Sequence, residues 1–131
     1  MPAVPKIGSK HELRFGVEPQ HTIDFASADL PPVLATPWLI WFLEHAALEL
    51  MQPLLDPGEI TVGTHIDIEH LAGALTGAEV RCVARVIHAE GPTITFQIEA
   101  HDAQDCLAKG LHKRRIVEAA RLARRLQRKQ S

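Results

Sequence analysis

One long apolar segment, Trp38–Met51, is nonpolar on nearly every side when it is drawn as a helix, and it limits the possible folds more than any other part of the chain. Thr36 is a favourable N-cap residue, Pro37 suits the first helical position, and Pro53 marks the end of the helix. A helix of this composition is buried on most of its sides rather than lying on a surface. Other parts of the chain must therefore wrap around it.

Strands are expected to do this wrapping, because much of the remaining sequence alternates between apolar and polar residues. The alternating runs are His11–Glu18, Ile60–His70, Val80–Val86 and Ile94–Ala100, and a further run, Cys106–Val117, is expected to be the last strand. Such alternation is typical of half-buried antiparallel strands. One strand, one buried helix, four strands and a terminal helix predict an α+β fold in which an antiparallel sheet wraps around the helix.

Length and composition indicate a single domain. The chain has 131 residues, of which 46% are hydrophobic and 23% are charged, so it can bury a core without disulfides or metals. Residues 1–9 are expected to form a flexible arm, residues 10–117 the domain, and residues 118–131 a basic C-terminal helix. One sheet around one helix leaves strand edges and apolar surface open, which favours a homodimer.

The sequence also bears on where the protein resides. The longest apolar run, Trp38–Leu43, is far too short to span a bilayer, and the N-terminal residues lack the apolar stretch of a signal peptide. Cys82 and Cys106 are expected to be reduced thiols. We therefore expect a cytoplasmic protein without a membrane partner.

The net charge of −2 hides a strong asymmetry along the chain. Residues 109–129 carry nine Lys or Arg and one acidic residue, Glu118, whereas residues 1–108 carry five basic and fifteen acidic residues. A basic segment raises nucleic acid, membranes and polyphosphates as partners. Nucleic acid is disfavoured, because no aromatic residues interleave with these cations. We expect Arg121–Lys129 to form a solvated helix face.

Three residues interrupt apolar patterns. Glu44 lies within the apolar helix. It is either a functional carboxylate or a residue of the single solvent-exposed side of the helix, beside His45 and Glu49. His70 continues the parity of Ile60, Val62, Ile66 and Ile68, and it is either a structural histidine or an acid–base group. Gly63 interrupts the same strand, which is typical of a bulge or of the close approach of a ligand.

Neither a metal nor a cofactor is expected. His65, Asp67 and Glu69 share one strand face at a spacing of two, where they could hold a metal, but a solvated polar face is the favoured interpretation. His101 and Asp102 are interpreted as a strand end and a turn. The sequence contains no GxSxG, HExxH, P-loop or GxGxxG motif.

Several separated blocks keep a common order and spacing. They are Val33–Ala47, Leu55–Glu59 and Val62–Ala72, followed by Thr76–Val80, Ala89–Gly91, Ala100–Asp102 and Gly110–Arg114. Together they resemble the hotdog-fold thioesterases, and more narrowly the fluoroacetyl-CoA thioesterase-like group, over about residues 10–117. The resemblance implies a long helix wrapped by an antiparallel sheet, a homodimer, and active sites at the dimer interface.

The resemblance also implies the site residues. Thr36, Glu44 and His70 correspond to the catalytic set, Gly63 to a residue of the substrate pocket, and Arg114 to an arginine near the site. Glu44 would activate water as a general base or attack the thioester carbonyl directly, and His70 would transfer protons. Thr36 and Glu44 lie about 12 Å apart along one helix. They therefore meet one carbonyl only if the substrate lies along the helix or if a second subunit contributes.

The implied activity is hydrolysis of an acyl-CoA thioester with a short or medium acyl group. The alternative is a non-catalytic acyl-CoA-binding or regulatory protein of the same fold. Ser27 and Leu30 stand where the lid of the fluoroacetyl enzyme has phenylalanines, so a fluoroacetyl substrate is not implied. Arg114, with Lys113 and Arg115, is expected to meet the CoA phosphates, because guanidinium groups suit phosphate.

Overall fold

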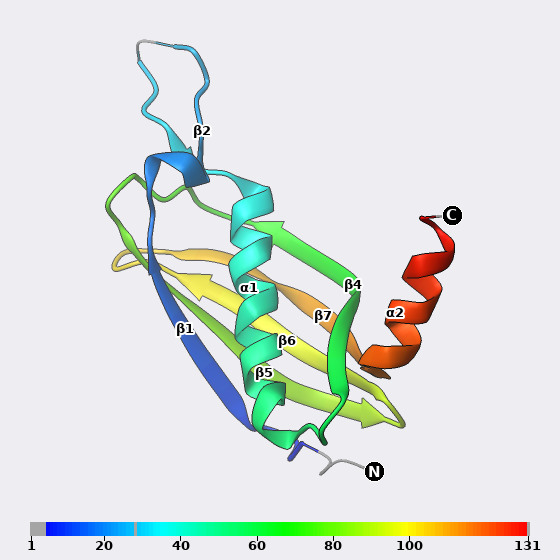
Figure 1. The fold of residues 1–131 in the computed structure, drawn as a ribbon. Helices are drawn as coiled ribbons and strands as arrows, with labels where there is room; N and C mark the ends of the chain where they lie inside the picture. The colour runs from blue at the N-terminus through cyan, green and yellow to red at the C-terminus, as the bar shows by residue number, and fades with distance from the viewer. Residues whose placement is uncertain (1–4, 28, 131) are drawn as a thin grey trace.

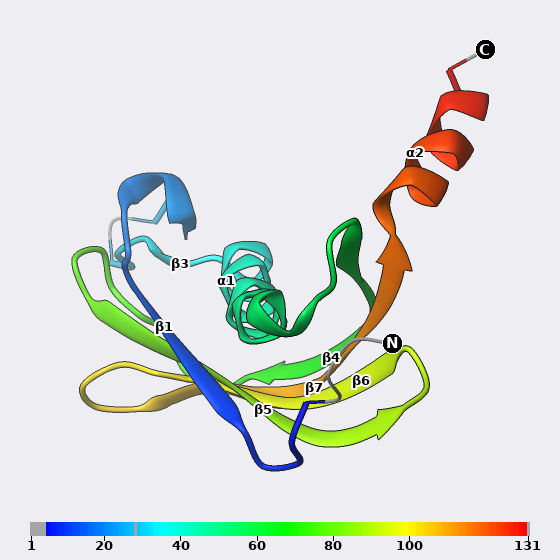
Figure 2. The same cartoon turned by 60° about the horizontal axis from the view of Figure 1, so that its bottom comes forward.

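The computed structural model describes residues 5–27 and 29–130 (Figure 1). Its main sheet has five antiparallel strands in the order β1-β5-β6-β7-β4. These strands are β1 (Lys10–Gly16), β4 (Glu59–His70), β5 (Glu79–Glu90), β6 (Thr93–His101) and β7 (Cys106–Glu118). The helix α1 (Thr36–Met51) lies in the concave side of the sheet (Figure 2). The predicted α+β arrangement is confirmed.

Short elements that the sequence did not predict surround the start and end of α1. A 3-10 turn, η1 (Pro19–His21), precedes a two-stranded ribbon of β2 (Thr22–Ile23) and β3 (Val33–Leu34). A second turn, η2 (Gln52–Leu54), follows α1. Elements this short have no periodicity of their own to read, because they contain only two or three residues each.

The core lies between α1 and the sheet, and it confirms the predicted alternation of β5 and β6. The buried residues of these two strands include the predicted apolar faces: Val80, Cys82, Ala84 and Val86, then Ile94, Phe96, Ile98 and Ala100. Side chains of successive residues point to opposite faces of a sheet, so every second position meets the helix. This face holds α1 in a fixed orientation against β4 and β7, which carry the candidate site.

The prediction that α1 is buried on most sides is confirmed in part: in the single chain only Thr36, Pro37 and Trp41 are exposed, but only one side is fully buried. Its buried residues are Leu39, Leu43, Ala46, Ala47 and Met51, which lie on the side toward the sheet. On the other side, Trp41 is 46% exposed and stacks on the ring of His45 at 3.7 Å. One sheet covers only one side of the helix, so an apolar side is left open.

The prediction that Ile60, Val62, Ile66 and Ile68 share one face is also wrong. The register of β4 against β7 shifts between Gly63 and His65, which is a β-bulge. Before the bulge Thr61 is buried and Ile60 is exposed, whereas after it the half-buried residues are Ile66, Ile68 and His70. One extra residue in a strand exchanges the two faces, so the alternation cannot be followed through it.

The N-terminal end of the described chain is hydrogen-bonded to the sheet, whereas the C-terminal helix is not packed against it. Of the predicted N-terminal arm, residues 5–9 run into the sheet, where the Gly8 N–H donates to the Val86 carbonyl at 2.8 Å. The helix α2 (Ala119–Arg128) begins one residue later than predicted and buries none of its residues. It stands away from the sheet at the end of β7 (Figure 2). Within residues 5–27 and 29–130, no helix is long and apolar enough to cross a bilayer.

Candidate active site

The first cluster of predicted site residues joins the start of α1 to the end of β4. Thr36 Oγ1 and His70 Nδ1 form a hydrogen bond of 2.7 Å. Thr36 is exposed and His70 is half-buried, so both are accessible from solvent. Thirty-four residues separate them in the chain, and only the packing of α1 against the sheet brings them together.

The capping role predicted for Thr36 is wrong. Ala35 is the N-cap residue, Thr36 is the first residue of the helix, and no side chain caps this end. The Thr36 hydroxyl is therefore not used to satisfy a backbone N–H of the first turn. It is available to orient the imidazole of His70 instead.

The second cluster lies about two turns further along α1, where Glu44 faces β4 and β7. Arg114 Nη1 donates to Glu44 Oε2 at 3.2 Å. The Arg114 side chain is only 5% exposed, whereas that of Glu44 is 38% exposed. The Glu44 carboxylate is thus accessible to solvent and is held by a hydrogen bond from the buried Arg114 guanidinium. Glu44 is therefore directed toward the sheet edge at β4 and β7, whereas Trp41, three residues before it on α1, is exposed.

Arg114 is itself fixed by the edge strand β4. Its Nε donates to Thr61 Oγ1 at 2.9 Å, and its Nη2 donates to the Thr61 carbonyl at 3.0 Å. Burial lowers the pKa of the Arg114 guanidinium, and the nearby Glu44 carboxylate opposes this effect. A guanidinium stays charged in spite of such a shift. The hydrogen-bonding capacity of Arg114 is thus directed into the protein, not outward.

His112 belongs to this cluster, and the sequence interpretation missed it as a site residue. It is 1% exposed, and its Nδ1 lies 2.8 Å from the carbonyl oxygen of His65. A carbonyl only accepts, so Nδ1 carries the proton and Nε2 accepts from Arg114 Nη1 at 3.2 Å. Burial is the main cause that lowers the pKa of His112, with a further contribution from Arg114. The signal available in the sequence was its parity, which it shares with Arg114 along β7.

Gly63 faces the same cluster, and the bulge predicted there is confirmed. A Cβ atom at Gly63 would lie 2.5 Å from Glu44 Oε2, and 3.3 Å from Cε1 of His112. Any larger residue would push the Glu44 carboxylate away. The absence of a side chain at Gly63 is thus a condition for the position of Glu44.

Within one chain the two clusters do not meet. Thr36 and Glu44 are separated by about 12 Å along α1. His70 and Gly63 are separated by about 20 Å along β4. Among the described residues, no hydrogen bond or ion pair joins the Thr36–His70 pair to the Glu44–Arg114 pair. The structure therefore brings the predicted residues together in two groups, not in one.

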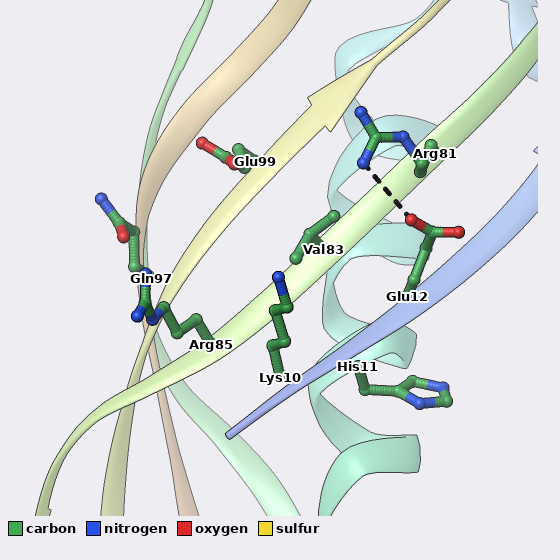
Figure 3. A pocket seen from close by; sticks show the side chains of 8 residues that line it. All are labelled: Lys10, His11, Glu12, Arg81, Val83, Arg85, Gln97 and Glu99. Carbon is green, nitrogen blue, oxygen red and sulfur yellow. Dashed lines mark hydrogen bonds and ion pairs between the residues drawn. The ribbon is translucent and has the colours of Figure 1, made fainter. Parts of the chain in front are cut away.

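Other polar groups lie away from these clusters. A cavity of about 410 Å³ crosses β1, β5 and β6 on the sheet face opposite α1, where Arg81 pairs with Glu12 (Figure 3). None of the predicted site residues lines it. In the described part of the chain, no group of three or more His, Cys, Asp or Glu side chains is placed to hold a metal ion.

Comparison with known proteins identifies the family. The family model of the fluoroacetyl-CoA-specific thioesterases (FlK) matches residues 17–120. The fluoroacetyl-CoA thioesterase of Streptantibioticus cattleyicolor is 30% identical over 118 residues, which cover 86% of this chain and 85% of that protein. The match includes α1, β4 and β7, and thus both clusters.

Solved structures agree with this assignment. The structure of the fluoroacetyl-CoA thioesterase FlK superposes with a TM-score of 0.89 at 27% identity, covering 97% of this chain and 98% of the other. A thioesterase superfamily member from Thermus thermophilus superposes with a TM-score of 0.87 at 29% identity, covering 95% and 93%. A hot-dog-like protein from Thermanaerovibrio acidaminovorans shares the fold at 24% identity, with a TM-score of 0.85 and coverage of 94% and 91%. The chain therefore belongs to the fluoroacetyl-CoA-specific thioesterase family and is a hotdog-fold thioesterase.

Proposed function

We propose that this thioesterase hydrolyses the thioester of an acyl-CoA with a short or medium acyl group, and that it works as a homodimer. Thr36, Glu44 and His70 act as the catalytic residues, and Gly63 and Arg114 line the pocket that binds the acyl group. The observation that carries the proposal is the accessible Glu44 carboxylate, held by buried Arg114 against Gly63. The fluoroacetyl-CoA thioesterase relative, whose named acyl group is short, supports the substrate class.

Glu44 has one oxygen available for chemistry. Oε2 accepts from Arg114, whereas Oε1 has no hydrogen-bond partner among the described residues. In the proposed reaction Oε1 takes a proton from a water molecule as the water oxygen attacks the thioester carbonyl carbon. The C–S bond then breaks, and His70 supplies the proton that the departing thiolate takes up. Thr36 holds the His70 ring in the orientation for this transfer.

A homodimer would bring the two clusters closer together. β4 is an edge strand, and its half after the bulge can pair with the same half of a second copy about a two-fold axis. If Ile68 lies on that axis, His70 of the second copy is opposite Ile66. It is then about 10 Å along the strand from Gly63, instead of about 20 Å within one chain. Such a dimer would also cover the open side of α1 around Trp41.

The test is release of free thiol from a panel of acyl-CoA esters of increasing chain length. We expect turnover of short or medium esters by the wild-type protein, and a loss of at least about 100-fold in kcat for Glu44→Gln and for His70→Ala. Glu49→Gln is the matched control, because Glu49 lies on the same helix and pairs with His11 instead. Wild-type turnover by both site variants would refute the proposed site.

A second measurement separates the enzyme from a non-catalytic binding protein. Binding of CoA esters by calorimetry, without release of thiol from any ester in the panel, would favour the binding protein. Release of thiol with saturation kinetics would exclude it.

A further inference from the structure

A groove of about 740 Å³ lies where α2 leaves the sheet, between α2, the end of β7 and the start of β4. Its floor includes the apolar residues Val62, Pro92 and Leu122. Three arginines also line it: Arg115 from β7, and Arg121 and Arg125 from α2. The groove thus combines an apolar floor with guanidinium groups, which are the groups that recognise phosphates in pairs of hydrogen bonds.

The three arginines are not directly paired with another side chain of the described residues. All three are exposed, and none has a hydrogen bond or ion pair among the described residues. Two carboxylates, Glu59 and Glu118, also line the groove, and Glu59 Oε1 accepts from the Asp56 N–H in the turn before β4, so cationic side chains exceed anionic ones in the lining by one. Because none of the three guanidinium groups is paired within the described residues, each can donate to a phosphate that enters the groove.

The groove adjoins the candidate active site through two cross-strand pairs. Gly63 pairs with Arg114 at the active site, and the next pair, Val62 with Arg115, lies in the groove. Neighbouring residues of a strand point to opposite faces, so the groove and the active site lie on the two sides of the same stretch of sheet. The bulge after Gly63 disrupts the edge of β4 there, and a flexible ligand can pass around it without displacing a paired strand.

The expected contact between Arg114 and the CoA phosphates does not fit this geometry. Arg114 donates to Thr61 and Glu44 and is almost completely buried. The free guanidinium groups lie on the other face, at Arg115 and on α2. Two of these arginines, Arg121 and Arg125, belong to the helix that was expected to form only a solvated face.

We infer that this groove binds the 3′-phosphorylated ADP part of CoA, with the phosphates on Arg115, Arg121 and Arg125 and the adenine on the apolar floor. The inference rests on the proposed function, since it assigns the far end of the same substrate. The pantetheine arm would run from the groove around the edge of β4 to the thioester beside Glu44.

The first experiment measures binding without any thioester. Adenosine 3′,5′-bisphosphate, which carries the nucleotide but no acyl group, is titrated into the full-length protein by calorimetry. We expect Arg121→Gln and Arg125→Gln each to raise Kd about five-fold, the effect of one exposed charge pair. Arg124→Gln removes the same charge from the same helix outside the groove, and it should leave Kd unchanged.

The second experiment compares two thioesters of the same acyl group, one on CoA and one on pantetheine, which lacks the nucleotide. The double variant Arg121→Gln/Arg125→Gln should raise KM for acyl-CoA without changing kcat, and leave KM for acyl-pantetheine at the wild-type value. An equal change for both thioesters, or an equal effect of Arg124→Gln, would overturn the inference. So would loss of duplex DNA binding by the double variant while its nucleotide affinity is unchanged.

These outcomes also separate the inference from the proposed function. If the wild-type protein hydrolyses neither thioester, the proposed function fails, whatever the groove binds. If it hydrolyses both thioesters with the same KM and does not bind the bisphosphate, the function stands and the groove assignment fails.

Discussion

The position of the Glu44 carboxylate depends on two neighbouring residues, one that binds it and one that leaves space for it. Arg114 attracts Oε2 with a charged hydrogen bond, and Gly63 leaves the space that this oxygen occupies. A carboxylate is a useful base only if it is held within hydrogen-bond reach of the proton that it accepts. The geometry of this site is therefore decided by a missing side chain as much as by a charged one.

Substitution of Gly63 by alanine tests this dependence. The added Cβ would lie 2.5 Å from Glu44 Oε2, so the carboxylate must move. We expect kcat for an acyl-CoA to fall by about 10- to 100-fold, since a displacement of about 1 Å in an active site has effects of this size. Gly16→Ala is the control, because a Cβ there meets no atom within 4 Å. Equal kcat for Gly63→Ala and wild type would contradict the placement of Glu44.

His112 gives a prediction for stability and pH. Burial lowers its pKa, so the folded protein holds His112 neutral while the unfolded chain takes up a proton near pH 6.5. Its contribution to stability is therefore complete above pH 6.5 and is lost as the pH falls from there toward the lowered pKa. Denaturant unfolding at pH 7.5 and 5.5 should show a larger loss for the wild type than for His112→Asn. Equal losses in both proteins would mean that His112 is not held neutral.

At the scale of elements, the helix α1 and the strand β4 form the site because each is irregular at one point. α1 begins without a side-chain cap, which leaves the Thr36 hydroxyl for His70. β4 contains a bulge after Gly63, which turns Thr61 and Gly63 toward α1 on one side of the bulge and His70 toward it on the other. A regular strand would place these residues on opposite faces.

Thr36→Val separates a catalytic hydroxyl from a helix cap. Loss of a true N-cap hydroxyl costs about 1 kcal/mol. Because Ala35 is the N-cap residue here, we expect the free energy of unfolding to change by less than about 0.5 kcal/mol, while kcat for an acyl-CoA falls at least about ten-fold. Thr36→Ser keeps the hydroxyl and should retain most of the activity. A stability loss of the full cap value would restore the capping role.

At the scale of the whole molecule, one chain leaves its two clusters apart and one side of α1 open. The edge of β4 and the exposed side of α1 around Trp41 would both be covered in the proposed homodimer. Burial of this apolar side would also agree with the composition of the helix, which is nonpolar on nearly every side. The single chain alone does not explain that composition.

Mixing two inactive variants tests whether one site uses two chains. In a mixture of Glu44→Gln with His70→Ala, refolded together, a mixed dimer has one site with both wild-type residues if Glu44 and His70 come from different chains. We expect activity to return in the mixture, measured as thiol release, although neither variant is active alone. No recovery, with mixed dimers demonstrated by differently tagged chains, would place both residues of a site in the same chain.

The class and order of the main elements, from α1 through the four strands that follow it, can be predicted from the amino-acid sequence, because they depend on periodicity within short segments. The sequence also pointed to Thr36, Glu44, Gly63, His70 and Arg114, through their family resemblance and, for some, through residue types that interrupt an apolar pattern. The role of His112 was missed, because the sequence around it does not alternate and its apolar neighbour Leu111 is the exposed one.

How these residues are grouped depends instead on contacts between elements that are distant in the chain. The pairs Thr36–His70 and Glu44–Arg114 are 34 and 70 residues apart in the chain, so they depend on the register of β4 against β7 and on how α1 packs across them. After the bulge at Gly63, the side chains of β4 that face α1 are those at even positions instead of odd ones. The sequence of β4 alone does not reveal this change, because a bulge is defined by the pairing with β7. Local periodicity fixes each element, whereas contacts between distant elements fix the site.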